Sequence, residues 1–307
     1  MPPGCILVTG ASGFVGQHLV PALRIAFPGA ELHTAPFEVT DEAAVRTAIG
    51  TVRPEAVVHL AAIAAIPAAR LDPGRAWQVN LLGTLNVARA MLDRVPGATL
   101  LFASSADIYG ASFRAGTPLN EDAVLAPLNT YSATKAAADL ALGAMAAEGL
   151  RVVRVRPFNH TGPGQAPGFV VPAFAEQVAR VAAGLQPPVL RVGALDPLRD
   201  FLDVRDVCAA YAACLARSDT LAPGTVLNVA SGRPRRVGDV LAALMAAAGV
   251  EAEIVTDVGR LRPTDIASAV GNATLARRLL DWAPAVPWEQ TIADVLADWQ
   301  ARVGQTH

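Results

Sequence analysis

The sequence has few cysteines and no pattern that would pair them. Cys5, Cys208 and Cys214 are the three in its 307 residues, and they form no Cys-x-x-Cys pair and no cluster with histidine. Disulfide-stapled domains and structural zinc sites depend on such spacing, so the sequence indicates neither, and we expect no bound metal. The cysteines are instead predicted to be small core residues.

Neither sign of charge is in excess. The chain has 25 lysines and arginines against 27 aspartates and glutamates, a formal net charge of -2. A general polyanion binder would be basic, so we do not expect nucleic acid as a partner. The sequence also lacks a basic N-terminal region followed by an apolar run, and lacks any apolar stretch long enough to cross a bilayer. We therefore expect a cytoplasmic protein with no membrane partner.

What the sequence has in quantity is apolar residues, which make up 52% of the chain against 17% charged residues. This is the composition of a compact globular protein. Helix-patterned segments alternate with apolar runs typical of buried strands, at 5–8, 31–34, 56–62, 99–103 and 152–156. Such alternation predicts an α/β fold with a doubly wound parallel (Rossmann) sheet.

The alternation weakens after residue 158, where proline and glycine become frequent. We interpret residues 1–158 as a dinucleotide-binding Rossmann domain to which residues 200–230 return. The segments 159–199 and 231–307 are predicted to form a smaller, interleaved C-terminal lobe that binds the substrate.

A glycine-rich turn follows the first predicted strand and opens a helix, in the segment TGASGFVG at 9–16. Glycines let the backbone approach a pyrophosphate, and the helix N-terminus offers free N–H groups and the positive end of its dipole. Directly after a strand, this pattern favours a dinucleotide site over an ordinary turn. The predicted cofactor-binding residues of this turn are Gly10, Ser12, Gly13, Phe14, Val15 and Gly16.

The second predicted strand should end in the residue that reads the adenosine ribose, where a carboxylate would select NAD. It ends instead in Leu32-His33-Thr34, without Asp or Glu. This absence favours NADP(H), with NAD(H) as the alternative. Glu38 and Val39 are predicted to lie near the adenine, although Glu38 and Asp41 would also suit the polar start of the next helix.

Further cofactor contacts are predicted at the ends of the remaining parallel strands, where ligands bind in such sheets, and in the helix that follows one of them. His59 is interpreted as a packed core histidine because it lies in an apolar strand. The predicted contacts are Leu60, Ala61, Ala62, Asn80, Ser104, Pro157 and Phe158.

Tyr131 and Lys135 are four residues apart at the start of an Ala-rich run that we expect to be helical, so their side chains lie on one face. A lysine ammonium beside a phenol would lower the phenol pKa from about 10, so that the tyrosine could exchange a proton with a carbonyl or alcohol oxygen. Both residues are also predicted to contact the cofactor, the lysine through a ribose. A surface pair on an amphipathic helix is the alternative.

Seven short segments follow one another in a recognisable order: TGASGFVG at 9–16, HLAA at 59–62, SSADIYG at 104–110, YSATK at 131–135, RPFNHTGPGQ at 156–165, RDFLDVRDV at 199–207 and LRPTDI at 261–266. Together they resemble the extended short-chain dehydrogenases/reductases that act on nucleotide sugars. Within that family, the run at 157–165 and the later Arg199-Asp200-Phe201 are most similar to the reductases of GDP-4-keto-6-deoxy-D-mannose.

The resemblance implies reduction of the C4 ketone of that GDP-linked sugar by NAD(P)H, giving GDP-D-rhamnose. It implies that Ser105 bonds the C4 oxygen, that Tyr131 is the general acid, and that Lys135 tunes it. The substrate-binding residues it implies are Ser105, Ala106, Asp107, Asn159, Val170, Arg191, Arg199, Arg262 and Asp265.

Four of these residues are assigned to the nucleotide by the resemblance. Asn159, Arg199 and Arg262 are similar to the residues that hold the diphosphate, which guanidinium groups bind bidentately. Asp265 is similar to the residue that bonds a ribose hydroxyl. Taken alone, each arginine would be a solvated surface charge.

Three alternative functions stay open. GDP-mannose 4,6-dehydratases carry a catalytic glutamate where this chain has Asp107, which is one methylene shorter, so we favour the reductase. Epimerisation at C4 would use the same Ser105, Tyr131 and Lys135 with a tightly held NAD. A non-catalytic dinucleotide sensor is disfavoured because these three residues are all present.

Family resemblance further implies a homodimer. The Ala-rich helices expected over 80–91 and 131–147 would pair with their copies in a second subunit. Burial of both helices inside a monomer is the alternative.

Overall fold

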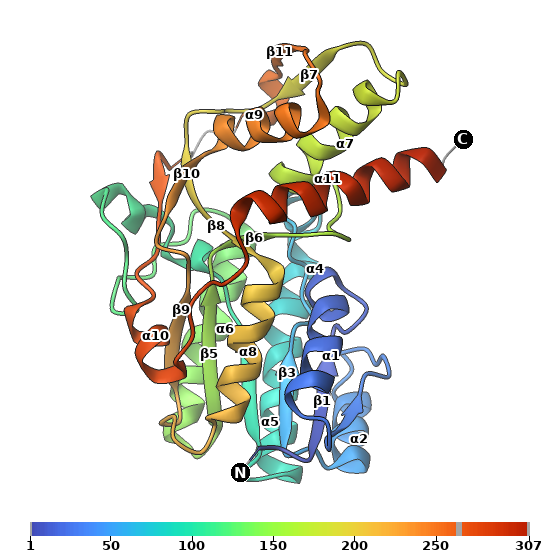
Figure 1. Ribbon diagram of the computed structural model, residues 1–307. Coiled ribbons are helices and arrows are strands. Elements are labelled where there is room, and N and C mark those ends of the chain that lie inside the picture. The colour runs from blue at the N-terminus through green and yellow to red at the C-terminus, as the bar shows by residue number, and fades with distance from the viewer. Residues whose placement is uncertain (1, 262–265, 306–307) are drawn as a thin grey trace.

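The computed structural model describes residues 2–261 and 266–305 and has two parts, one above the other in Figure 1. The lower part is a sheet between two layers of helices. The upper part holds short strands and three longer helices, and the chain crosses between the two parts several times. The N-terminus lies at the bottom of the sheet and the C-terminal helix extends across the upper part.

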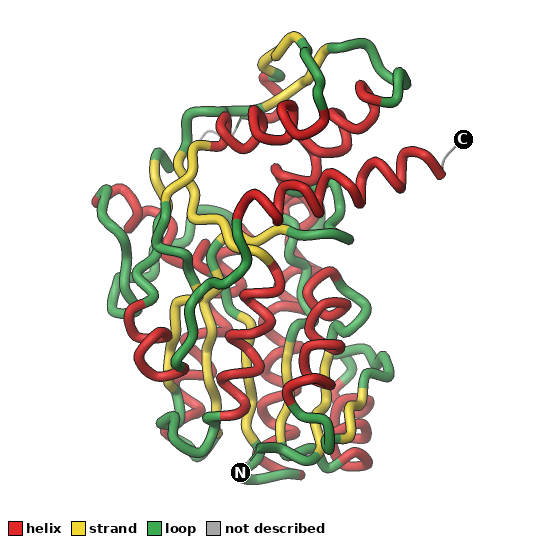
Figure 2. The backbone as a smooth tube through the Cα atoms, in the orientation of Figure 1, coloured by secondary structure: helices red, strands yellow, loops and turns green. Residues whose placement is uncertain are grey.

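The lower sheet has six parallel strands in the order β2-β1-β3-β4-β5-β9, which stand side by side in Figure 2. This order reverses direction at β1, as in doubly wound folds, so the predicted Rossmann sheet is confirmed. The strands are β1 (Cys5–Thr9), β2 (Glu31–His33), β3 (Ala56–His59), β4 (Thr99–Ala103), β5 (Arg151–Pro157) and β9 (Thr225–Val229).

Helices cover both faces of this sheet because its central strands are apolar on both sides. In β1, Ile6 and Val8 join the core on one face and Leu7 joins the core on the other. The first face is covered by α1 (Phe14–Ala26), α8 (Val204–Ala216) and α10 (Thr274–Leu280). The second is covered by α2 (Glu42–Val52), α5 (Thr84–Arg94) and α6 (Thr130–Ala147).

Short helical segments follow β3 and β4. A π-helical turn, η1, lies directly before α5, and a 3-10 segment, η2, follows β4. Their bounds, with those of two short helices, are α3 (Ile66–Leu71), α4 (Pro73–Trp77), η1 (Gln78–Gly83) and η2 (Ala106–Ala115).

The upper part is built around α7 (Val170–Ala182), α9 (Val237–Ala248) and α11 (Trp288–Gln305), which share a separate apolar core. Its central strand is β8 (Leu198–Asp203), which pairs with β6 (Asn159–Thr161), β10 (Pro234–Arg236) and β12 (Ser268–Ala269). A second small sheet joins β7 (Val189–Val192) to β11 (Glu253–Thr256), and η3 (Val258–Arg260) follows it.

The expected division of the chain differs from the structure in two details. Residues 200–203 belong to β8 of the upper part and not to the Rossmann sheet, to which the chain returns only at α8. In the C-terminal segment, α10 packs on the Rossmann core, where Ala276 and Leu280 are buried beside α8 and β9. A short apolar helix pattern predicts a buried face but does not say which of two cores buries it.

Two further predictions concern the chain as a whole. No helix in the described ranges 2–261 and 266–305 is long and apolar enough to span a membrane. Cys208 and Cys214 are buried core residues, as predicted, whereas Cys5 is half-buried, and all three thiols are free.

The position of α10 can be tested by truncating Leu280, which is 2% exposed. Leu280→Ala should lower the free energy of unfolding by about 2–5 kcal/mol, because it leaves a cavity in the Rossmann core. Urea unfolding would measure the loss, with Ile25→Ala as the control because Ile25 on α1 is 83% exposed. Equal effects of the two substitutions would contradict this placement of α10.

Candidate dinucleotide and active site

The glycine-rich turn between β1 and α1 lies against the end of β3. Gly10 has φ +71°, and a Cβ atom there would stand 2.7 Å from the backbone nitrogen of Ala61. A Cβ on Gly16 would clash with the Ala11 carbonyl. Gly13 is the N-cap of α1 and is exposed, so the first turn of that helix presents free N–H groups beside a turn that only glycine can form.

The residues after β2 are placed by a local set of polar contacts. Glu38 accepts hydrogen bonds from Thr40, which hold its pKa below the usual value, and it forms an ion pair of 2.9 Å with Arg75. Val39 is buried, and its carbonyl accepts a bond from Asn86. Asp41 caps α2 by accepting from the Ala44 N–H, as the alternative interpretation expected.

His59 is a packed core residue, as predicted. Its ring nitrogens lie 2.7 Å from the Thr9 hydroxyl and 3.0 Å from the Thr84 hydroxyl. Burial, helped by the charge of Lys135, lowers the pKa of His59 to about 3. The ring is therefore neutral, and it ties β1 and β3 to α5.

Asn80, a predicted cofactor contact, is bonded to other groups of the protein. The residue has no exposed surface, and its side chain bonds the backbone N–H and carbonyl of Ile63 at 2.8 and 3.1 Å. Its amide also donates to the Thr134 hydroxyl at 3.0 Å. Asn80 therefore supports the loop after β3 and links it to α6, because its bonds are directed inwards.

Tyr131 lies in the first turn of α6, which has a strong start signal. The Asn129 side chain accepts from the Ser132 N–H at 2.9 Å, and Ser132 contacts the Asn129 backbone in return, forming a capping box. The Ala-rich sequence then favours helix throughout. The structure brings Tyr131 together with Ser105, which bonds its phenol and lies at the end of β4.

Lys135 lies one turn further along α6 and is 3% exposed. Its ammonium donates to the Ala103 carbonyl at the end of β4 and lies 4.2 Å from the centre of the Phe102 ring. Burial lowers the pKa of Lys135 to about 7, against the opposing effect of Asp139. The lysine is thus held at the carboxyl end of β4, with a proton that it can lose near neutral pH.

The expected lowering of the Tyr131 pKa is wrong for this structure. Burial raises the pKa of Tyr131 above its usual value, the charge of Asp107 raises it further, and only the hydrogen bond from Ser105 opposes them. Lys135 does not offset this effect, since its ammonium is directed at the Ala103 carbonyl. The phenol is therefore protonated at neutral pH, the state from which it can donate a proton.

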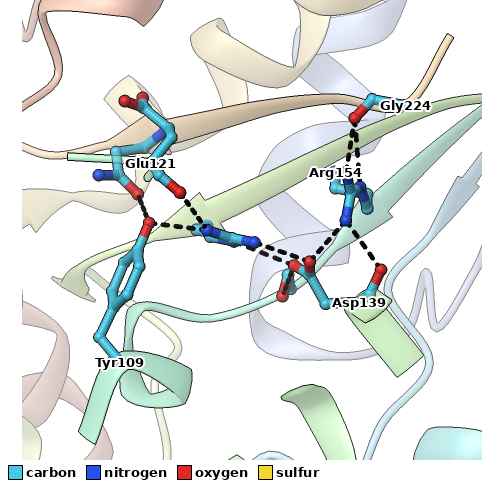
Figure 3. Close-up of polar contacts among 8 residues, drawn as sticks. Tyr109, Glu121, Asp139, Arg154 and Gly224 are labelled. Carbon is cyan, nitrogen blue, oxygen red and sulfur yellow. Dashed lines mark hydrogen bonds and ion pairs between the residues drawn. The ribbon is translucent and has the colours of Figure 1, made fainter. Parts of the chain in front are cut away.

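A buried polar network behind Lys135 was missed by sequence reasoning (Figure 3). Asp139 of α6 accepts from Ser104, Arg154 and Arg156, and Arg156 continues to Tyr109 of η2 and to the Glu121 carbonyl. Two features of the sequence could have indicated this network. Asp139 follows Lys135 by four residues, one helical turn, and Arg154 and Arg156 stand inside an otherwise apolar strand. Ser104, predicted to contact the cofactor, uses its hydroxyl in this network.

The predicted substrate residues are spread over both parts. Ala106 and Asp107 follow Ser105 in η2, with the Asp107 N–H donating to the Ser105 hydroxyl at 3.1 Å. Asn159 begins β6 and pairs in register with Phe201 of β8, two residues after Arg199. Arg262 and Asp265 lie outside the described residues.

The remaining predicted substrate residues, Val170 and Arg191, lie on α7 and β7 of the upper part. Val170 is the first residue of α7 and is 36% exposed. Arg191 of β7 lines a surface pocket of about 490 Å³ together with side chains of α7 and η3, Arg180 and Arg260 among them. Neither Ser105, Tyr131 nor Lys135 lines this pocket, so it is separate from the tyrosine site.

A glycine turn at a helix N-terminus and a Ser, Tyr and Lys set meet at the carboxyl edge of one parallel sheet. This arrangement defines a class, the NAD(P)-dependent oxidoreductases with a Rossmann fold. The remaining predicted cofactor residues also lie at strand ends: Leu60, Ala61 and Ala62 follow β3, Pro157 ends β5 and Phe158 follows it. The chain matches the model of the NAD dependent epimerase/dehydratase family over residues 6–230. It belongs to that family.

Two curated relatives act on GDP-linked sugars according to their names. The chain is 39% identical to the GDP-6-deoxy-D-mannose reductase of Pseudomonas aeruginosa, over 97% of this chain and 98% of that one. It is 29% identical to the GDP-6-deoxy-D-talose 4-dehydrogenase of Aggregatibacter actinomycetemcomitans, over 87% of this chain and 88% of the relative.

Solved structures are similar over nearly the whole chain. The structure of RMD from Pseudomonas aeruginosa complexed with NADPH has a TM-score of 0.85 at 36% identity and covers 97% of this chain and 99% of that one. The UDP-glucose 4-epimerase of Thermus thermophilus complexed with NAD has a TM-score of 0.83 at 29% identity and covers 96% and 99%.

The glycine turn can be tested at Gly13, whose φ of −74° suits any residue and whose added Cβ would meet only the Gly10 carbonyl, at 3.2 Å. Gly13→Ala should fold with little change in melting temperature, but weaken NADPH binding by about 10-fold or more, because the methyl group occupies the approach of the pyrophosphate. Fluorescence titration of NADPH would measure this. The control is Gly29→Ala, where a Cβ meets nothing within 4 Å; unchanged NADPH binding by Gly13→Ala would contradict the site.

Proposed function

We propose that the protein reduces the C4 ketone of GDP-4-keto-6-deoxy-D-mannose to give GDP-D-rhamnose. The observation that carries this proposal is the near full-length similarity to the GDP-6-deoxy-D-mannose reductase of Pseudomonas aeruginosa, combined with a complete Ser105, Tyr131 and Lys135 set. The relatives named for GDP-linked sugars support guanosine diphosphate as the nucleotide.

The reaction requires a proton for the C4 oxygen and stabilisation of the charge that develops there. Bound nicotinamide cofactor supplies a hydride to the carbon. Tyr131, whose pKa is raised by burial and by Asp107, holds the proton and donates it to the oxygen. We assign to the Ser105 hydroxyl, which is close enough to the phenol to lower its pKa, a second hydrogen bond to the same oxygen.

Lys135 serves the cofactor in this proposal. Its ammonium donates to the Ala103 carbonyl at the end of β4, and we assign its remaining N–H groups to a ribose hydroxyl of the cofactor. The charged ammonium is a stronger donor than the neutral amine. Since the pKa of Lys135 is near 7, activity should fall as pH rises above neutrality.

We propose NADPH as the preferred reductant. The end of β2 offers His33 and Thr34 and no carboxylate that would select the 2′-hydroxyl of NAD. The similar RMD structure holds NADPH. The similar epimerase holds NAD, so NADH is the alternative, and the ratio of kcat/KM for the two cofactors distinguishes them.

The nucleotide is proposed to lie against the upper part. Asn159 and Arg199 belong to neighbouring strands, β6 and β8, and are assigned to the diphosphate. Arg262 is assigned to the same diphosphate and Asp265 to a ribose hydroxyl, on resemblance alone. Val170 and Arg191, at the start of α7 and on β7, are assigned to the rest of the nucleotide.

A GDP-mannose 4,6-dehydratase is the second candidate, because Asp107 lies close enough to Tyr131 to raise the pKa of the phenol. In that reaction a carboxylate in the position of Asp107 would remove the C5 proton. The shorter side chain of aspartate, compared with the glutamate of dehydratases, favours the reductase. Conversion of GDP-mannose without added NADPH would favour the dehydratase.

The role of Tyr131 is tested by Tyr131→Phe, assayed through NADPH oxidation at 340 nm with GDP-4-keto-6-deoxy-D-mannose. The loss of the phenol proton should lower kcat by about 10²–10⁴-fold while NADPH binding is retained. Tyr211→Phe, which changes a buried tyrosine of α8, is the matched control. Undiminished turnover by Tyr131→Phe would remove the tyrosine from the mechanism.

We also propose a cytoplasmic homodimer that pairs along α6 and the η1 to α5 helix. This face exposes apolar side chains that water would otherwise surround, with Leu140 of α6 60% exposed, Leu82 of η1 50% and Trp77 of α4 40%. These elements contact one another, so the side chains belong to one surface.

Leu140→Glu should shift the protein to a monomer in sedimentation velocity, because it places a charge in the proposed contact. Ile25→Glu, at an exposed position on α1, is the control and should leave the assembly unchanged. A monomeric unsubstituted protein, or a Leu140→Glu variant that stays dimeric, would contradict the proposed contact.

A further inference from the structure

Asp139 is the most completely bonded side chain of the buried network, and it lies one helical turn after Lys135. It has no exposed surface and accepts four hydrogen bonds (Figure 3). Ser104 donates at 2.6 Å, Arg156 donates through two nitrogens at 3.1 and 2.8 Å, and Arg154 donates at 3.0 Å. Every lone-pair direction of the carboxylate is thus used, which fixes both its position and its orientation.

The donors come from the strands on which α6 packs. Ser104 follows β4, and Arg154 and Arg156 are alternate residues at the end of β5. Ser104 is also the neighbour of Ala103, whose carbonyl accepts from Lys135. Asp139 and Lys135 are therefore attached to consecutive residues of the same strand end, so a shift of Asp139 would move the lysine as well.

The titratable and charged groups near Lys135 lie on several elements. His59 of β3 is neutral at working pH, and Asp107 of η2 acts on Tyr131. Arg154 and Arg156 of β5 face Asp139. Glu121, beside Arg156, has a pKa raised by burial. Asp139 is the neighbouring anion that acts on the lysine.

The arginines keep this anion ionised. Burial alone would raise the pKa of Asp139, but the hydrogen bonds and charge of Arg156, with those of Ser104 and Arg154, bring it below the usual value. An arginine does not lose its own proton in a protein, so this arrangement holds across the working pH range. The buried lysine is the group whose protonation can change.

We propose that Asp139 is a positioning residue for the reaction, which holds Lys135 at the end of β4 and keeps its ammonium charged by supplying a fixed negative charge one helical turn away. This inference rests on the proposed role of Lys135 in binding the cofactor. It assigns Asp139 a role beyond packing, because the carboxylate acts on the lysine through its charge as well as through the hydrogen bonds that fix α6.

Charge and anchoring are separated by two substitutions. Asp139→Asn removes the charge and retains the size of the side chain, whereas Ser104→Ala removes one hydrogen bond and leaves the charge. Without the nearby anion the ammonium is less stable, so Lys135 loses its proton at lower pH. Both NADPH binding, followed by fluorescence, and kcat/KM should therefore decline with rising pH. This alkaline limb of the pH profile should lie about one pH unit lower in Asp139→Asn than in the unsubstituted protein.

Ser104→Ala should weaken NADPH binding without moving that limb. Comparison between variants in the same buffers removes the titration of the cofactor itself. Lowering the pH should restore much of the activity of Asp139→Asn, which a purely structural defect would not allow. If the single variant does not fold, the double variant Asp139→Asn with Arg154→Gln keeps the net charge of the buried cluster. It is compared with Arg154→Gln alone, from which it differs only in the Asp139 charge, and its activity should decline at lower pH than that of Arg154→Gln.

Identical pH profiles for Asp139→Asn and the unsubstituted protein, or for the double variant and Arg154→Gln, would overturn the inference, as would an equal displacement in Ser104→Ala. The NADPH arm needs no sugar substrate. If the unsubstituted protein binds NADPH but does not reduce the GDP-linked ketone, the proposed function fails while the NADPH profiles still decide the role of Asp139.

Discussion

The structure depends on the contact between helix α6 and the carboxyl ends of β4 and β5. Asp139, buried and bonded by Ser104, Arg154 and Arg156, attaches the helix to both strands. A buried carboxylate is stable only with such complete pairing, so the helix has one favourable position on the sheet. That position brings Tyr131 to Ser105 and Lys135 to the Ala103 carbonyl. The site is thus a consequence of how one helix is docked.

The protonation state of Tyr131 is the one that reduction of a ketone requires. Burial and Asp107 raise the pKa of the phenol, so it retains the proton that a general acid must donate. Burial lowers the pKa of Lys135 to about 7, so small changes in its surroundings alter its protonation. The nearby Asp139 carboxylate opposes this lowering and favours the charged ammonium. A protonated Tyr131 thus agrees with the similarity of this chain to a GDP-6-deoxy-D-mannose reductase.

Local patterns predicted what local chemistry determines. The glycine turn, the parallel strands and the Ala-rich helix that holds Tyr131 were predicted because turn geometry, apolar runs and helix propensity depend on neighbouring residues. The Asp139 network was missed because its partners lie on other elements, and the Tyr131 pKa was predicted in the wrong direction because burial and Asp107 appear only in the fold. The core in which α10 is buried was also predicted wrongly, because the packing of a short helix depends on contacts that are distant in the sequence. Contacts of Asn159, Arg191 and Arg199 with a nucleotide remain predictions.

The central claim is that this site transfers a hydride to C4 of a GDP-linked 4-keto sugar and a proton to its oxygen. The most direct measurement uses NADPH deuterated on the transferring face of the nicotinamide, with NMR analysis of the sugar product. We expect one deuterium at C4 of GDP-rhamnose for each NADPH consumed. A product without deuterium at C4, or conversion of GDP-mannose to its 4-keto sugar without consumption of NADPH, would contradict it.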